Sequence, residues 1–281
     1  MAGDVAGGTG WSLSDGGVLT VGADYVWKTP AEEGQSSSEW ISYKEKIRSI
    51  VVEDGAVSVG DAAFAGCDSA TFLTLPNSVR EIGECAFYRC ESLESATLPK
   101  KLTRLGAKAF FRCMRIPKFC IPSGVTEISK MAFSQCYCLD SLVIPASVTK
   151  LGDMAFDYCF ALRHVVCQST TPPKLGNNSI SQFNGERLYV PAEAVEAYKE
   201  SAWAEFFAEI LAIPDPSAAA VVDIEEADGA SVRVTDGVVT VGGAAARVYT
   251  LQGRKMPAGR PIGKGLYVVA TPRGAVKVAV R

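Results

Sequence analysis

The residues of this sequence that are able to do chemistry are nine cysteines and one histidine, His164. Thiolates and imidazoles bind metals and serve as nucleophile and base in hydrolases. Cys136-Tyr137-Cys138 lacks the two-residue spacing of zinc-binding pairs, and no second pair or nearby histidine completes a site. Nucleophilic catalysis would need His164 as its base, and no partner motif accompanies it. We therefore expect no metal, no cofactor and no enzymatic activity.

Five of the cysteines belong to a repeat with a period of 23 residues. The pattern Ala-Phe-x-x-Cys places its aromatic residue at Phe64, Phe87, Phe110, Phe133 and Phe156, and its thiol at Cys67, Cys90, Cys113, Cys136 and Cys159. Equivalent cysteines that project inward in parallel are interpreted as buried free thiols. Occasional disulfides between neighbouring units are the alternative, since strands about 4.8 Å apart permit a bridge.

One repeat unit predicts a strand and a turn. Leu73-Thr74-Leu75-Pro76 alternates apolar and polar residues like a half-buried strand, and the proline ends it. Residues 82–87 then return on the opposite side, which we interpret as a short helical turn that points Phe87 inward. A single turn cannot bury a phenylalanine, so the units must stack into a solenoid. Its parallel sheet lies on one face and its helical turns on the other.

The phase of the repeat extends beyond the five full units. Ile50 lies 23 residues before Leu73, and Leu188 falls on the same register at the far end, so seven strands are predicted. Two positions depart from the pattern: Pro117 lies inside a strand, and Ser129 replaces a column of glycines. We expect local distortion there without loss of the stack.

The pattern divides the chain into four parts. Residues 1–44 form an aromatic-rich N-terminal cap, and residues 45–213 form the repeat array, which ends in a capping helix over 192–207. Residues 214–217 read as a linker. Residues 218–281 contain short strand-like runs separated by glycine-bearing turns, which predict a small all-β domain, a β-sandwich.

Composition limits the classes of partner. The 281 residues carry a net charge of -3, with 48% hydrophobic and 21% charged residues, which is typical of a globular protein without a nucleic-acid partner. No run approaches the roughly 18 apolar residues of a membrane-spanning helix. The first residues read as a loop, so we expect that a signal peptide was removed and Met1 added. A monomer is expected.

The outward face of the predicted sheet is the candidate binding site. Alternation along each strand directs two side chains per unit outward. The candidate ligand-binding residues are Phe72, Thr74, Ser95, Thr97, Lys118, Ser141, Val143, His164 and Val166, with Cys120 in the same ladder. The valines and the phenylalanine make this face more apolar than a solvated sheet needs, and such patches often bind partners. The alternatives are an ordinary exposed His164 and a face covered by loops or by the cap.

The repeat resembles a known family. Residues 82–90, Ile-Gly-Glu-Cys-Ala-Phe-Tyr-Arg-Cys, and 121–128, Ile-Pro-Ser-Gly-Val-Thr-Glu-Ile, are similar to the BspA-type leucine-rich repeat, and the resemblance covers about 45–213. It implies a leucine-rich repeat solenoid in a bacterial surface or secreted protein. Some members of that family bind host matrix proteins or other cells.

The tail resembles a second class of domain. Residues 248–255 and 264–269 are similar to the C-terminal sorting or anchoring domains of Bacteroidetes-type secreted proteins, which implies export or attachment. Together, the two resemblances predict a secreted or cell-surface adhesion protein that binds a host or bacterial surface protein or a glycan. The alternative is a structural or cell-envelope assembly component with no soluble ligand.

Overall fold

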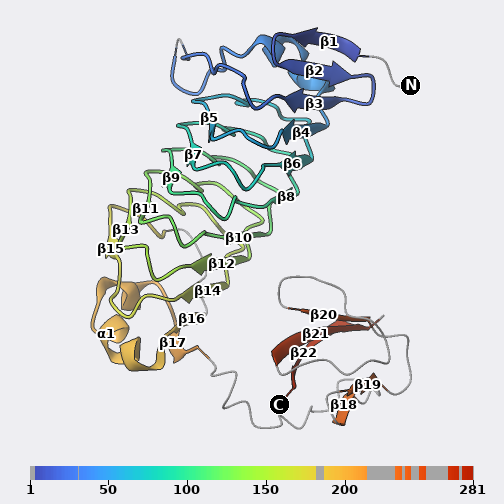
Figure 1. The fold of residues 1–281 in the computed structure, drawn as a ribbon. Helices are drawn as coiled ribbons and strands as arrows, with labels where there is room; N and C mark the ends of the chain where they lie inside the picture. The colour runs from blue at the N-terminus through green and yellow to red at the C-terminus, as the bar shows by residue number, and fades with distance from the viewer. Residues whose placement is uncertain are drawn as a thin grey trace. The chain divides into compact units, whose positions relative to one another are not determined.

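A computed structural model gives the fold of the chain (Figure 1). It describes residues 4–30, 32–181 and 187–213, together with the backbone of strands in the tail. The chain divides into two compact units, residues 1–213 and 214–281. The predicted linker over 214–217 lies outside the described residues.

The first unit is a solenoid whose main sheet follows the 23-residue period. Strands one period apart pair in parallel, except for β8 and β10, so that Ile50 lies opposite Leu73 and Leu142 opposite Val165. The strands are β4 (Ser49–Val52), β6 (Phe72–Thr74), β8 (Ser95–Ala96), β10 (Lys118–Cys120), β12 (Ser141–Ile144), β14 (His164–Cys167) and β16 (Arg187–Val190). The prediction of seven strands is confirmed.

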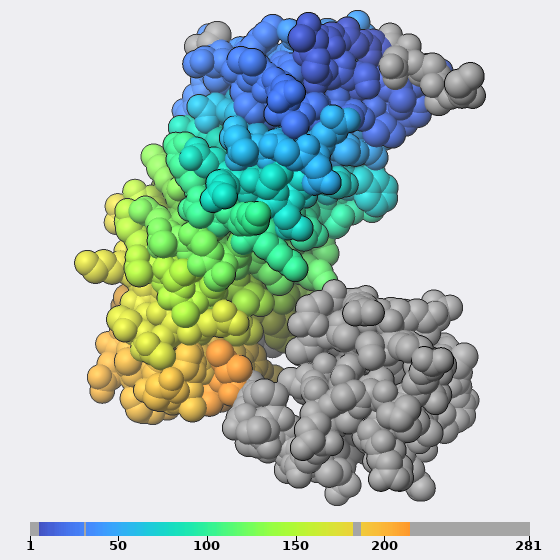
Figure 2. Space-filling view, in the orientation of Figure 1, coloured from blue at the N-terminus to red at the C-terminus, as the bar shows by residue number. Residues whose placement is uncertain are grey.

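Short strands form a second, minor sheet on another side of the stack (Figure 1). They are β5 (Ser58–Val59), β7 (Glu81–Ile82), β9 (Arg104–Leu105), β11 (Glu127–Ile128), β13 (Lys150–Leu151) and β15 (Lys174–Leu175). We number the coils from the residue that precedes each main strand: coil 1 is residues 48–70, coil 2 is 71–93, coil 3 is 94–116, coil 4 is 117–139 and coil 5 is 140–162. In the space-filling view these coils follow one another without a gap (Figure 2).

The turn side, which carries the Ala-Phe-x-x-Cys segments, is not helical. Here the predicted short helical turn is wrong. In coil 1 the backbone N–H groups of Ala62, Phe64 and Gly66 donate to carbonyls of coil 2 at 2.7–2.8 Å. Ala62 and Gly66 have left-handed φ angles of 47° and 74°, which direct alternate N–H groups out of the coil, whereas a helix would keep them inside. The N–H groups between them, those of Ala65 and Cys67, donate within the coil to the residue three earlier at 3.1–3.2 Å, so inter-coil bonds and turn bonds alternate and no continuous helix forms.

The phenylalanines of the repeat stack along the core beneath this turn side. Successive ring centroids are 5.4, 5.0, 5.7 and 5.3 Å apart from Phe64 to Phe156, with planes within 15° of parallel. All five rings are buried, as the repeat predicts. Stacked aromatic rings contribute roughly 0.5–1.5 kcal/mol per pair beyond the area that they bury.

The cysteine column hydrogen-bonds one coil to the next. The thiols of Cys90, Cys113, Cys136 and Cys159 donate to the phenylalanine carbonyl of the preceding coil at 3.2–3.3 Å. The five repeat cysteines are buried, as predicted, and all nine cysteines are free thiols in the structure. A small side chain with one weak donor suits this position.

The N-terminal cap extends the main sheet with a hairpin. Strands β1 (Asp4–Gly8), β2 (Trp11–Ser14) and β3 (Val18–Val21) are antiparallel, and β3 then pairs in parallel with β4. The short helix η1 (Glu39–Lys46) places Trp40 against Phe64, with their rings stacked at 5.4 Å. The cap thereby covers the open end of the phenylalanine column.

The C-terminal cap differs from the predicted single helix over 192–207. The structure has η2 (Ala192–Ala194), α1 (Val195–Lys199) and η3 (Ala202–Glu205), followed by β17 (Glu209–Ala212), which adds a further parallel strand beside β16. The chain turns at Ser201, whose hydroxyl accepts from the N–H of Trp203 and begins η3. The turn lets Trp203 pack on Tyr198.

The tail contains two small antiparallel sheets. One pairs β18 (Val232–Thr235) with β19 (Val238–Val241), and the other contains β20 (Arg247–Thr250), β21 (Gly265–Thr271) and β22 (Gly274–Val280). The side-chain core that the predicted β-sandwich requires lies outside the described residues. Within the described part of the chain, no helix has the length and apolar run needed to cross a membrane.

Candidate binding face

The main sheet is divided into two sheets, and this division splits the predicted binding face. The first sheet runs from β1 to β8 and the second from β10 to β17. Phe72, Thr74 and Ser95 lie on the first sheet, and Thr97 directly follows β8. Lys118, Ser141, Val143, His164 and Val166 lie on the second. All nine candidates are on the outward side of the coils, but the structure does not bring them together in one sheet.

The outward face of the first sheet mixes polar and apolar side chains without a continuous apolar row, because Val18 (37% exposed), the half-buried Val51 and Phe72 each have only serine or threonine neighbours along their ladders. Phe72 is 57% exposed and lies between Ser49 and Ser95 in the ladder. Thr74 and Thr97 are exposed. An isolated exposed apolar side chain is ordinary on a protein surface. The first sheet is therefore the poorer candidate for a binding site.

The outward face of the second sheet carries a continuous apolar ladder. Cys120 lies opposite Val143, which lies opposite Val166, then Tyr189 and finally Leu211. We call these five residues the apolar ladder. Val143, Val166 and Tyr189 are half-buried rather than exposed, because side chains on strands about 4.8 Å apart shield one another. Leu211, at the end, is 38% exposed.

A polar ladder runs beside the apolar ladder on the same face. It contains Lys118, Ser141, His164, Arg187 and Glu209 in register. Arg187 Nε lies 3.0 Å from Glu209 Oε2, and this hydrogen bond is the main reason that the pKa of the arginine is raised. Lys118 and His164 are exposed. The face therefore combines apolar area with basic groups at its edge.

Sequence reasoning missed the C-terminal end of this face. Tyr189 lies between Leu188 and Val190, which both point inward. The alternation of apolar side chains along this strand therefore marks Tyr189 as outward. Leu211 gave no such signal. In its strand Glu209 lies opposite Arg187, which is 22 residues earlier in the chain. Leu211 therefore does not fall on the 23-residue period.

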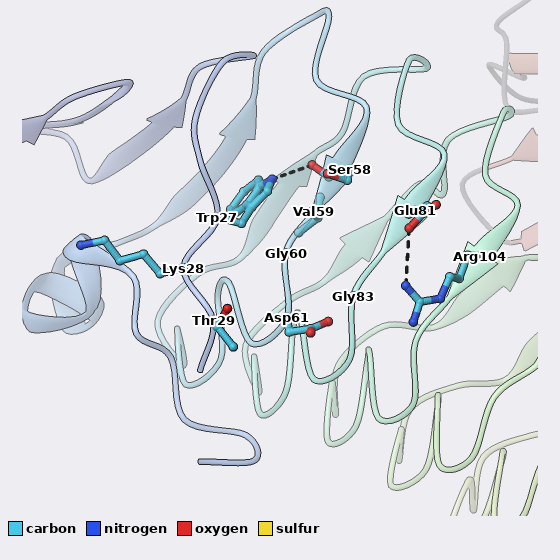
Figure 3. A pocket seen from close by; sticks show the side chains of 10 residues that line it. All are labelled: Trp27, Lys28, Thr29, Ser58, Val59, Gly60, Asp61, Glu81, Gly83 and Arg104. Carbon is cyan, nitrogen blue, oxygen red and sulfur yellow. Dashed lines mark hydrogen bonds and ion pairs between the residues drawn. The ribbon is translucent and has the colours of Figure 1, made fainter. Parts of the chain in front are cut away.

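A separate cleft of about 250 Å³ lies where residues 27–29 cross the minor sheet (Figure 3). Its floor includes Gly60 and Gly83, and the indole of Trp27 donates to the carbonyl of Ser58 at 3.0 Å. On the opposite wall Arg104 forms an ion pair with Glu81 at 3.4 Å. The cleft has the size for a small polar solute, but no histidine or cysteine lines it.

One group of potential metal ligands forms through the N-terminal segment. The ligand atoms of Glu33, Glu84 and Cys85 lie within 4.8 Å of one another. The Lys108 ammonium already pairs with Glu33, and burial raises the pKa of the Cys85 thiol to about 11. Because a metal needs the thiolate and must displace the lysine, this group fits a cation poorly.

The repeat cysteines are equally unsuited to nucleophilic chemistry. Burial raises the pKa of Cys67 to about 12, and it raises the pKa values of the other repeat cysteines in the same direction. A nucleophile needs the thiolate state, which burial opposes. Cys136 is buried and Cys138 is exposed, so these two neighbouring cysteines do not face the same environment and cannot act together as a ligand pair.

Comparison with solved structures finds leucine-rich repeat proteins. The Leucine Rich Repeat protein of T. pallidum is 24% identical with a TM-score of 0.46, and the match covers 59% of this chain and 82% of that one. A leucine-rich repeat protein from Bacteroides ovatus is 21% identical with a TM-score of 0.42, over 68% and 57% of the two chains. A leucine rich cell surface protein from Faecalibacterium prausnitzii is 23% identical with a TM-score of 0.32, over 62% of each.

Comparison of the sequence finds a family model that matches part of the chain. None of the curated proteins is similar to the chain. The family model described as the BspA type Leucine rich repeat region matches residues 37–163 in six copies. These residues span coils 1 to 5, and β14 and β16 continue the same parallel register beyond them. Residues 37–163 are therefore similar to the BspA type of leucine-rich repeat, which supports the predicted resemblance over the first part of its range.

Proposed function

We propose that the protein is a non-enzymatic recognition protein, secreted or held at the cell surface, that binds a partner protein through the outward face of its second sheet. The apolar ladder from Cys120 to Leu211 carries this proposal. Contiguous apolar area on a soluble surface is typical of interaction sites, and a tyrosine within it is typical of interface centres. Lys118 supplies a charged group at the rim, and His164 supplies a polar imidazole.

The proposed location is supported by the repeat and the tail. Residues 37–163 match the BspA type of leucine-rich repeat, which is found mostly in bacterial surface and secreted proteins. The tail resembles sorting or anchoring domains. A protein partner is favoured over a glycan, because the apolar ladder offers few hydrogen-bonding groups to hydroxyls.

A paired-variant experiment tests the face. The full chain is probed against an array of purified extracellular-matrix proteins and glycans, beside the double variant Val143→Glu with Val166→Glu. The matched control is Thr74→Glu with Thr97→Glu, which adds the same charges at equivalent outward positions of the first sheet. We expect the first variant to weaken binding at least tenfold, roughly the effect of losing an interface centre, and the control to retain it.

The outcomes separate the proposal from its alternatives. Equal binding by both variants, with circular dichroism showing intact folds, would exclude the second sheet as the site. Binding confined to glycans would replace the protein partner. A silent array, combined with loss of cell association on deletion of residues 218–281, would favour the structural or cell-envelope role.

A further inference from the structure

Both sheets of the solenoid are interrupted at the same level. The main sheet stops at β8 and resumes at β10, and the minor sheet stops at β9 and resumes at β11. Both gaps lie between coil 3 and coil 4. Every other pair of neighbouring coils from coil 1 to coil 5 is joined on both faces.

Pro117 accounts for the gap in the main sheet. In the other coils the residue at this position donates to the carbonyl one period earlier: Thr71 to Arg48 at 2.9 Å and Glu94 to Thr71 at 3.0 Å. Pro117 comes one period after Glu94, but proline has no N–H. It therefore cannot donate to the Glu94 carbonyl, and this bond between coil 3 and coil 4 is missing. The series resumes with Asp140, which donates to Pro117 at 2.9 Å.

Ser129 marks the gap in the minor sheet. Gly106 donates its N–H to Ile82 at 2.8 Å, and Gly152 donates to Ile128 at 2.7 Å. At Ser129 the side-chain hydroxyl donates instead, to the carbonyl of Leu105 at 2.6 Å. A rotatable hydroxyl thus replaces a fixed backbone rung.

Surface charges follow the same division. Arg104 of coil 3 pairs back to Glu81 of coil 2 at 3.4 Å, and Lys150 of coil 5 pairs back to Glu127 of coil 4 at 2.7 Å. In the described residues, no ion pair joins Arg104 to Glu127 across the boundary. The ion pairs that the described residues form therefore lie within one half or the other.

The turn side continues across the boundary. Phe110 donates its N–H to Ala132 at 2.8 Å, and the Cys136 thiol donates back to Phe110 at 3.3 Å. The ring of Phe119 packs on Phe110 and on Phe133, with centroids 5.1 and 4.5 Å away. The two halves are therefore joined by backbone bonds along the turn side and by apolar packing in the core, to which β10 contributes Phe119.

We propose that the boundary between coils 3 and 4 is a joint, at which the turn side acts as the hinge and the sheet side opens. Opening breaks no backbone ladder bond on either sheet, only the side-chain bond from Ser129 to Leu105, whereas any other coil boundary within the array must break several ladder bonds. The movement changes the angle between the first and second sheet faces. This inference does not depend on the proposed function, because it concerns the free protein.

Hydrogen exchange of the full chain tests the joint. We expect the amides of β10 to exchange at least about tenfold faster than those of β12, because local opening exposes them without global unfolding. Pro117→Thr restores the missing N–H and is expected to remove most of this difference. Asp140→Thr is the matched control, because Asp140 occupies the position equivalent to Pro117 in the next coil and both aspartate and threonine have the backbone N–H. This substitution should leave the exchange rates of β10 unchanged.

A cross-link provides a test that does not depend on the proline. Thr97→Cys places a second thiol one period before Cys120 across the joint, whereas Val143→Cys pairs with Cys120 inside the second sheet, both in a Cys138→Ser background. Oxidation of the first pair is expected to slow exchange in β10 about tenfold, and oxidation of the second to leave it unchanged. Equal exchange in β10 and β12 of the unmodified protein, or no effect of either Pro117→Thr or the first cross-link, would overturn the joint.

Discussion

The turn side and the sheet side of the coils are built by the same repeat but differ in continuity. On the turn side, Phe64, Phe87, Phe110 and Phe133 each donate a backbone N–H to the next coil. The carbonyls of these phenylalanines accept hydrogen bonds from the cysteine thiols of the same neighbouring coil. On the sheet side, a single proline is enough to divide the ladder.

The difference shows how a solenoid tolerates irregular units. Each junction on the turn side has a backbone bond, a thiol bond and a ring stack, so the loss of one leaves the others. The junctions of the main sheet depend on the backbone N–H, which Pro117 removes. At the boundary between coils 3 and 4, cohesion of the array therefore comes from the turn side.

The largest expected contrast is in thiol reactivity. Seven cysteines are buried, whereas Cys120 on the sheet side and Cys138 in the loop before β12 are exposed. We expect iodoacetamide to label these two at least about a thousandfold faster than the other seven, which react only after opening of the core. Peptide mass spectrometry of a labelling time course measures the rates. Rapid labelling of Cys113 in the native protein would contradict a sealed turn side.

The next contrast is in the stability that each side contributes. Phe110→Ala removes a buried ring that contacts Phe87, Phe119 and Phe133, and should lower the free energy of unfolding by about 3–5 kcal/mol. Phe72→Ala makes the same change on the exposed sheet face, and about 0.5 kcal/mol or less is expected. Urea unfolding of both variants measures the difference. Equal losses would show that the sheet face has its own core.

Much of the fold follows from the sequence because residues 23 apart stack directly. The buried column from Phe64 to Phe156, the seven strands and the irregularity at Pro117 all came from this period. The turn conformation did not. Arg89 and Lys108 adopt φ angles of 58° and 55°, and neither residue type signals a left-handed backbone.

The binding face was predictable only as far as the repeat remained regular. Alternation identified Val143 and Val166 as outward, but it did not indicate that the face divides after Ser95. The ion pair of Glu33 with Lys108 joins residues 75 positions apart and follows no period. Contacts that the N-terminal segment makes with the coils depend on tertiary packing, which the repeat does not encode.

The smallest expected effect tests the backbone of the turn side. Gln135 has a φ of 61°, a left-handed conformation that costs a non-glycine residue roughly 1–2 kcal/mol. Gln135→Gly removes this strain but adds about 0.5–1 kcal/mol of chain entropy to the unfolded state, so we expect a net gain of about 0.5–1 kcal/mol. Thermal and urea unfolding measure the gain.

Gln168 on the sheet side is the matched position for this change. It donates its N–H to Ile144 at 2.9 Å and is not among the residues with a positive φ. Gln168→Gly therefore brings the entropy cost without relief of strain, and a loss of about 0.5–1 kcal/mol is expected. Opposite signs for the two substitutions would show that the inter-coil bonds of the turn side hold Gln135 in a conformation that its own side chain opposes. A loss at both positions would mean that the stack imposes no strain there.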